Sequence, residues 1–443
     1  MFKNLLVIIS ILSCFECFAQ KTFTLKECVD YTLSKHHSVQ LYKNKISIAK
    51  VQSLQSLGLY LPSVNVSAAL VDNLKLQTTV LPAGVLGPTP REIELGTKYN
   101  TNFGIDISQP IYDASKLMSI KGSKSGIEFS EIQKLQNDEN LIYNTSVSYF
   151  QYLIFQQQLD ILKTNELKYS EMVKVLEYQH SKGMVLERDV DRVRVNLNTT
   201  RYQIEDTRTK ERLALNVLKN AMGMELNDSL KISDMMNFED FIVRPLDGDF
   251  DVSNLYANKL GELSVVLQKY DVRSKRASFL PTLSAVAKWG NQSLSSSFSN
   301  VFSNWNDYSY VGLSFNVPLF TGLRRRNFLK ESELKLYNEE LNLAMSRENM
   351  RLEFDNSKSS VVSSYSLYQS NKDNMALAEK VLKVTDYQYQ RGVVSLTDYL
   401  NDDSSYKASQ SSYINSLYTL MISQLSYEKS RGKLYEFISV IER

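Results

Sequence analysis

Few residues of this chain have the spacing that catalysis or metal binding requires. The three histidines, His36, His37 and His180, show neither metal-ligand nor catalytic-triad spacing. The sequence also contains no glycine-rich loop of the kind that binds phosphate. These observations predict a protein that is not an enzyme and that holds no cofactor or metal ion.

One short segment occurs twice in the sequence in nearly the same form. The segment YQHSKGMVLERDV covers residues 178–190, and YQYQRGVVSLTDY covers residues 387–399. In both segments a glycine follows the first tyrosine by five residues, and an aspartate follows that glycine by six. Glycine supplies the left-handed conformation that a tight reversal between two helices needs. Gly183 and Gly392 are therefore predicted to lie at the tips of two helical hairpins.

Two further pairs of segments repeat in the same order. LGLYLPSVNVSAAL (57–70) matches RASFLPTLSAVAKW (276–289), and FGIDISQPIYD (103–113) matches VGLSFNVPLFT (311–321). The three pairs are offset by 219, 208 and 208–209 residues, so the first copy is longer in one place only. This pattern indicates a duplicated unit with one loop of variable length.

Each copy is predicted to contain a lead-in helix, two strands and a long broken helix. Residues 24–57 open with Thr24 three residues before Glu27, which is a helix capping box. Apolar residues then alternate with small or polar ones, which predicts strands. The strands are expected at about 62–72, 99–110, 281–291 and 308–318, with a loop at about 74–98.

Long helices follow the second strand of each copy. Residues 127–182 and 323–391 contain neither proline nor glycine, which is typical of uninterrupted helix. At 1.5 Å per residue, helices over about 114–182 and 323–390 would each be about 100 Å long. Such helices must bury an apolar stripe against other helices, as in a coiled coil.

The N-terminus is typical of an export signal over residues 1–20. Lys3 precedes the apolar run LLVIISILSCF and the small-residue site CFAQ. The run is shorter than the roughly 20 residues of a membrane-spanning helix. Cleavage near Ala19 and Gln20, or lipidation of Cys14, are both open. After cleavage only Cys28 remains, so no internal disulfide is expected.

Charge and length complete the domain prediction. The 443 residues include 51 basic and 49 acidic side chains, and this balance gives no electrostatic footprint for nucleic acid. We expect a first repeat at 21–221, a linker at 222–252 and a second repeat at 253–443. The first repeat has its tip at residue 183 and the second at residue 392.

The predicted strands require an oligomer. Each has one apolar face and one small or polar face, as in the wall of a membrane barrel. Four strands are too few to close a barrel, because the smallest have about eight. Open edges facing lipid would each leave backbone groups unpaired at a cost of several kcal/mol. Three copies would supply twelve strands and close the sheet.

The chain resembles the TolC-type outer-membrane efflux proteins from about Thr24 to the C-terminus. The resemblance is carried by the two Leu-Pro strand entries, by DISQPIYD and FNVPLFTG, and by the two glycine turns. It implies a mainly α fold with a small β part. That fold is a long α-helical coiled-coil barrel plus a transmembrane β-barrel completed by trimerisation, with four strands per protomer.

The same resemblance implies location and partners. We expect a homotrimer in the lipid of the cell outer membrane, with its helical part in the periplasm, acting as the exit duct of a tripartite efflux or type I secretion system. Its partners would be a periplasmic adaptor (membrane fusion) protein and an inner-membrane pump of resistance-nodulation-division or ABC type. A passive porin-like channel and a secreted coiled-coil structural protein are the alternatives. The sequence leaves the cargo and the pump class open.

The resemblance also assigns roles at the tips. Asp398 falls on an acidic position that lines the family's closed aperture, Asp189 on an acidic position of the other tip, and Tyr389 on a latch tyrosine. Val394 stands where a latch arginine is usual, and Asn401 replaces a second aperture acid, with Asp402 and Asp403 following it. Asp402 is therefore included among the aperture residues. The expected adaptor-docking residues are Gly183, Met184, Val185, Gly392, Val393 and Val394.

Overall fold

The computed structural model describes residues 22–85, 87–233 and 249–441. The predicted signal segment 1–20, with Cys14, and residues 234–248 of the predicted linker lie outside the described part. The chain divides into two compact units. The helical unit comprises residues 1–44, 131–260 and 344–443, and the sheet unit comprises residues 45–130 and 261–343.

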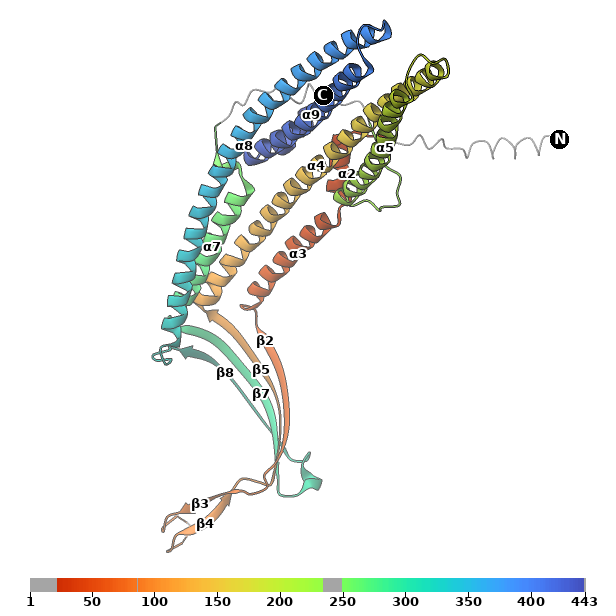
Figure 1. The fold of residues 1–443 in the computed structure, drawn as a ribbon. Helices are drawn as coiled ribbons and strands as arrows, with labels where there is room; N and C mark the ends of the chain where they lie inside the picture. The colour runs from red at the N-terminus through yellow and green to blue at the C-terminus, as the bar shows by residue number, and fades with distance from the viewer. Residues whose placement is uncertain (1–21, 86, 234–248, 442–443) are drawn as a thin grey trace, which may run out of the picture. The chain divides into compact units, whose positions relative to one another are not determined.

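The sheet unit is built on four antiparallel strands in the order β2-β5-β7-β8 (Figure 1). The strands are β2 (Ser63–Asp72), β5 (Tyr99–Tyr112), β7 (Thr282–Ser295) and β8 (Trp305–Asn316). β7 runs on to Ser295, beyond the expected end near residue 291. β2 and β8 form the two edges of this sheet.

A second, smaller hairpin replaces part of the loop expected at about 74–98. β3 (Gln77–Leu81) and β4 (Arg91–Leu95) pair antiparallel, with Gln77 opposite Leu95 and Leu81 opposite Arg91. The prediction of a loop over the whole of this segment was wrong. The segments QTTVL and REIEL contain the β-branched residues that favour strands. The prolines and glycines between and beside them led to the prediction of a loop.

The register of the four-stranded sheet separates apolar from polar side chains. One row across the strands joins Val64, Ile107, Ala287 and Val311, and the next row joins Asn65, Asp106, Lys288 and Tyr310. Because successive side chains of a strand point to opposite faces, these rows lie on opposite faces of the sheet. On the polar face Lys288 forms an ion pair with Asp106 at 3.0 Å.

The helical unit is dominated by two long hairpins. The first hairpin consists of α4 (Ala114–Ser181) and α5 (Glu187–Met222), and the second of α8 (Arg324–Gln390) and α9 (Leu396–Ser430). In Figure 1 the two helices of each hairpin run side by side. α4 and α8 begin in the sheet unit, whereas α3 (His37–Gly58) and α7 (Tyr256–Ala277) begin in the helical unit and end in the sheet unit. Helices dominate and strands form a small part, so the predicted mainly α fold class is confirmed.

The lead-in helix is divided at His36, which the sequence did not predict. α2 (Leu25–Lys35) begins with the expected capping box, in which the Glu27 N–H donates to Thr24 Oγ1 at 3.3 Å. His36 then has extended backbone, and its Nδ1 accepts from the Ser38 N–H at 3.1 Å, so it caps α3. Gly223 lies against His36 closely enough that a Cβ on Gly223 would stand 2.8 Å from the His36 Cα.

The main core of the helical unit brings together α2, α4, α5, α9 and the C-terminal helix α10 (Leu434–Ile441). Its fully buried members include Phe150 of α4, Leu218 of α5 and Leu417 of α9. α2 contributes Leu25 and the free thiol of Cys28 to the same core. A second cluster, called the tip cluster below, lies nearer the hairpin ends and comprises Tyr169, Val173, Leu176, Val190, Val193, Leu197, Leu382, Leu396 and Tyr399.

Candidate functional site

Both hairpins reverse direction through connections of the same length and geometry. Residues 182–186 join α4 to α5, and residues 391–395 join α8 to α9. Gly183 and Gly392 each have a φ of +72°. At each tip the glycine N–H donates to the carbonyl three residues back, and the next N–H to the carbonyl five residues back. This is the Schellman termination, which glycine permits because it carries no Cβ.

The repeated aspartate has a structural explanation in this geometry. Asp189 and Asp398 each occupy the third position of the returning helix, where a negative charge is favoured by the helix dipole. Asp398 completes a capping box, in which its carboxylate accepts from the Ser395 N–H at 3.2 Å and from Ser395 Oγ at 2.7 Å. Leu186 occupies the corresponding cap of α5 and makes no side-chain cap bond.

The other acidic residues of the predicted aperture also have partners within the chain. Asp189 is half-buried and lies 3.7 Å from Arg188 Nε and 4.0 Å from Arg192 Nη1. Asp402 accepts a hydrogen bond from Thr385 Oγ1 at 2.6 Å, which ties α9 to α8. Asp398 is the exposed member of the set.

Tyr389 is positioned by stacking. Its ring lies on that of Tyr399 with centroids 5.3 Å apart and planes 26° apart. Burial raises the pKa of Tyr389, and the nearby Asp189 carboxylate raises it further. Tyr389 and Asp189 belong to different hairpins. The effect of the Asp189 charge on Tyr389 shows that the fold brings these two predicted residues close together.

Apolar side chains stand exposed at both tips. Met184 is 72% exposed and Val393 is 70% exposed. Val185 and Val394, the next residue in each tip, are half-buried, and Val185 packs against the tip cluster. A Cβ added to Gly183 or to Gly392 would have nothing within 4 Å, so the backbone conformation alone disfavours larger residues there.

A group of charges around the buried Asp403 was not predicted from the sequence. Asp403, 1% exposed, accepts from Lys168 Nζ at 2.8 Å and from the Tyr169 hydroxyl. Lys407 Nζ lies 3.2 Å from the same carboxylate and donates to the Tyr169 hydroxyl. Tyr399, Asp403 and Lys407 are spaced four residues apart along α9, a pattern that places them on one face of a helix and could have drawn attention to them.

The environment of this group changes its proton affinities. Burial alone would raise the pKa of Asp403, but hydrogen bonds from Lys168 and Tyr169 outweigh it and hold that pKa below its usual value. Burial lowers the pKa of Lys407, and its ion pair with Asp403 opposes this only in part. Burial, together with the bond to Asp403, raises the pKa of the Tyr169 hydroxyl. Asp403 is therefore held as a carboxylate between two lysines.

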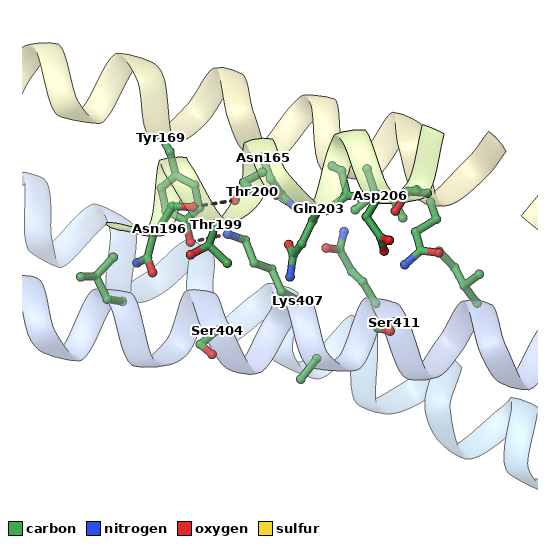
Figure 2. A pocket seen from close by; sticks show the side chains of 18 of the residues that line it. Asn165, Tyr169, Asn196, Thr199, Thr200, Gln203, Asp206, Ser404, Lys407 and Ser411 are labelled. Atoms are coloured by element: carbon green, nitrogen blue, oxygen red, sulfur yellow. Dashed lines mark hydrogen bonds between the residues drawn. The ribbon is translucent and has the colours of Figure 1, made fainter. Parts of the chain in front are cut away.

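A cavity of about 720 Å³ adjoins this group (Figure 2). It lies between α4, α5 and α9, and Tyr169 and Lys407 form part of its wall. Figure 2 shows the Lys407 side chain pointing toward Tyr169, while polar side chains surround the remaining space. Labelled members of this polar lining are Asn165, Asn196, Thr199, Gln203 and Ser411.

Within residues 22–85, 87–233 and 249–441, no group of three or more histidine, cysteine, aspartate or glutamate side chains is arranged to hold a metal ion. No described helix combines the length and apolar character needed to cross a membrane.

Comparison with known families decides the identity. A model of the family described as "Outer membrane efflux protein" matches residues 38–224 and 261–432, which is well over half of the chain. The chain belongs to the outer membrane efflux protein family. Both predicted hairpin tips and all four strands of the larger sheet fall inside the matched ranges. Membership places the protein in the outer membrane, with its helical part in the periplasm.

Individual relatives agree with this assignment. The alkaline protease secretion protein AprF of Pseudomonas aeruginosa is 24% identical over 226 residues, which cover 49% of this chain and 46% of AprF. The chain thus spans about half the length of that relative. The outer membrane efflux protein BepC of Brucella suis biovar 1 is 19% identical over 361 residues, covering 79% of this chain and 75% of BepC.

A solved structure shows the same fold. The chain superimposes on CusC with a TM-score of 0.76, covering 94% of this chain and 95% of that one at 16% identity. The resemblance to a TolC-type channel protein is therefore confirmed in fold as well as in family.

Proposed function

We propose that three copies of this chain form a channel across the outer membrane that serves as the exit duct of an efflux or type I secretion system. The observation that carries the proposal is the four-stranded sheet, which has one apolar face and two edges. On the apolar face of the edge strand β8, Val311, Leu313 and Phe315 are all exposed. Contact with lipid would bury these side chains, and pairing with further copies would satisfy the backbone groups of the edges.

The size of the sheet favours three copies. Four strands fall short of the roughly eight that the smallest membrane barrels have, whereas twelve strands form a closed wall with the polar row of Asn65, Asp106 and Lys288 facing water. BepC is named an efflux protein and AprF a secretion protein. Both names fit an exit duct for cargo delivered from within the cell, and the proposal assigns the chain no catalytic role.

Neighbouring residues of β8 provide a matched test of the lipid-facing surface. Leu313→Arg would place a charge on the apolar face, at a cost of roughly 2–4 kcal/mol near the bilayer midplane. Ser314→Arg would place the same charge on the polar face. We expect Leu313→Arg to abolish heat-resistant oligomers in the outer-membrane fraction and Ser314→Arg to preserve them. Equal assembly of the two variants would refute the proposed lipid face.

The tips are proposed to bind a periplasmic adaptor, which links the duct to an inner-membrane pump. Met184 and Val393 support this because they expose apolar side chains on two turns of identical backbone geometry. An apolar side chain exposed at a tip gives a protein partner surface to bury. Met184→Ser with Val393→Ser should reduce co-purification of the periplasmic adaptor while leaving oligomers intact. Unchanged co-purification would exclude these two residues from the interface.

Asp398 is proposed to line the narrow periplasmic end, where three copies would form an acidic ring that favours cations. Asp189, Asp402 and Tyr389 would surround the same aperture. Because Asp398 also caps α9, Asp398→Asn is the better variant: its amide oxygen can still accept from Ser395. In planar bilayers with a salt gradient, we expect Asp398→Asn to shift the reversal potential toward lower cation preference. An unchanged potential would place Asp398 away from the pore.

A further inference from the structure

The buried charges around Asp403 join the two hairpins in a reciprocal way. Lys168 of α4 lies over the ring of Tyr399 of α9, with Nζ 5.1 Å from the ring centroid. Lys407 of α9 lies over the ring of Tyr169 of α4, with Nζ 3.6 Å from the centroid. Each hairpin therefore places an ammonium group on an aromatic ring of the other, a contact that strengthens when it is desolvated. The carboxylate of Asp403 lies between the two.

The charges of this group do not balance. Among the described residues, Asp403 is the one carboxylate paired with both Lys168 and Lys407. The Tyr169 hydroxyl, whose pKa is raised, stays protonated. Removing one partner from a buried ionic group is far more damaging than replacing the whole group, because the remaining charge is left uncompensated. Without the Asp403 carboxylate, two neighbouring ammonium groups would repel each other across the two hairpins.

Apolar packing also connects the hairpins at this point, because Tyr169 and Tyr399 belong to the tip cluster. The cavity of about 720 Å³ separates parts of α5 from α9. Toward the tips, the tip cluster and a hydrogen bond from Arg192 Nη1 to Thr397 Oγ1 at 2.8 Å connect the hairpins. The Asp403 group bonds α9 to α4 where the tip cluster meets the cavity, because Tyr169 belongs to the cluster and also lines the cavity.

The group is not part of the duplication. Positions 209 residues away from Tyr399, Asp403 and Lys407 carry Val190, Arg194 and Asn198. Arg194 pairs with Glu177 at 2.7 Å and with Asp191 at 3.1 Å, and all three side chains are exposed. The same helical position is thus a solvated charge on α5 and a buried one on α9.

We propose that Asp403 is a positioning residue that fixes the second hairpin on the first, and that widening of the periplasmic end of the duct requires the bonds from Lys168 and Tyr169 to Asp403 to break. This inference rests on the proposed function for its consequence in transport.

The test measures the separation of the tips in purified oligomers of the full mature chain. Spin labels are placed on Met184→Cys and Val393→Cys, both exposed, with the buried Cys28 changed to Ser. We expect Asp403→Asn to shift the label-to-label distances to longer and broader values and to increase single-channel conductance. Lys168→Gln with Asp403→Asn and Lys407→Gln, which removes every charge of the group, should return the distances toward those of the parent protein.

Arg194→Gln is the matched control, because it removes the charge at the equivalent position of the first hairpin. We expect parent-like distances and conductance from it. A purely structural role would lower the thermal stability of Asp403→Asn oligomers while leaving both readouts unchanged, and that result would overturn the proposal. Equal shifts in Asp403→Asn and Arg194→Gln would overturn it as well.

A second variant covers failure of Asp403→Asn to assemble. Lys168→Met with Tyr169→Phe removes the hydrogen bonds from Lys168 and Tyr169 to Asp403, together with the bond from Lys407 to Tyr169. Asp403 stays paired with Lys407 inside α9. Parent-like label distances in this variant would contradict the inference. If parent oligomers assemble but conduct nothing, the proposed channel fails while the distances still report on the joint, so the two failures are distinguishable.

Discussion

The two hairpin tips share one backbone and differ in how their charges are used. Both have a glycine at φ +72°, the same pair of turn hydrogen bonds and an aspartate at the third position of the returning helix. Only the second tip completes a capping box, and only the second returning helix buries a carboxylate against the other hairpin. The two tips therefore keep the same backbone conformation while the side chains that follow them on α5 and α9 make different contacts.

The largest expected difference between the two hairpins concerns a half-buried glutamate of the first hairpin. Glu139 of α4 lies near Lys429 and Glu353, and burial raises its pKa to about 7. Its counterpart 209 residues later is Glu348 of α8, which is exposed.

Because the folded state favours the protonated form of Glu139, the stability that this group contributes is present below its unfolded pKa and is lost as the pH rises through about 7. We expect the free energy of unfolding to fall between pH 5 and pH 8 by roughly 3 kcal/mol, since each pKa unit corresponds to about 1.4 kcal/mol. Denaturant titrations of Glu139→Gln should lose most of this slope, whereas Glu348→Gln should keep it. A parent protein with no slope would refute the prediction.

The next effect concerns the two glycines. Gly183→Val and Gly392→Val should each cost about 1–2 kcal/mol, because a side chain is strained at positive φ although neither site is crowded. Gly126, inside α4 with open space around it and no positive φ, offers a control. Gly126→Ala should stabilise its helix slightly. Thermal melts compare the stability of the three variants. A tip variant as stable as Gly126→Ala would contradict the left-handed conformation assigned to that glycine.

The smallest expected effect concerns the N-terminal caps of α5 and α9. Ser395→Ala removes the side-chain cap of α9 and should cost about 1 kcal/mol. Leu186→Ser would create the missing capping box with Asp189 on α5 and should stabilise by a similar amount, because Leu186 has the extended backbone of a cap residue and is largely exposed. Opposite signs in thermal melts are expected. Destabilisation by Leu186→Ser would show that its apolar side chain has a partner in the assembled protein.

Local signals in the sequence predicted much of this fold. The glycine turns specify their own conformation, and the helices predicted at about 114–182 and 323–390 agree with α4 and α8 to within one residue at each end. The alternation around Val64, Ile107 and Val311 predicted the apolar face that the register then displays. These features depend on neighbours in sequence, so a single chain reveals them.

Features that depend on distant segments escaped prediction. Asp403 and Lys168 are separated by 235 residues. Among Asp398, Asp402 and Asp403, it is Asp403 that becomes buried and bonds to Lys168 when α9 packs on α4. His36, where the lead-in helix breaks, lies against Gly223 at the end of α5, a neighbour that is distant in the sequence. The roles of Asp398, Asp402 and Asp189 at an aperture, and of the tips in docking, stay predictions.

The number of chains in the native particle tests the central claim most directly. Native mass spectrometry of the protein extracted from outer membranes in detergent measures it without reference to any partner. We predict a single species of three chains, because three four-stranded sheets supply the twelve strands of the proposed wall. A particle of one chain, or of two chains with eight strands, would contradict the account.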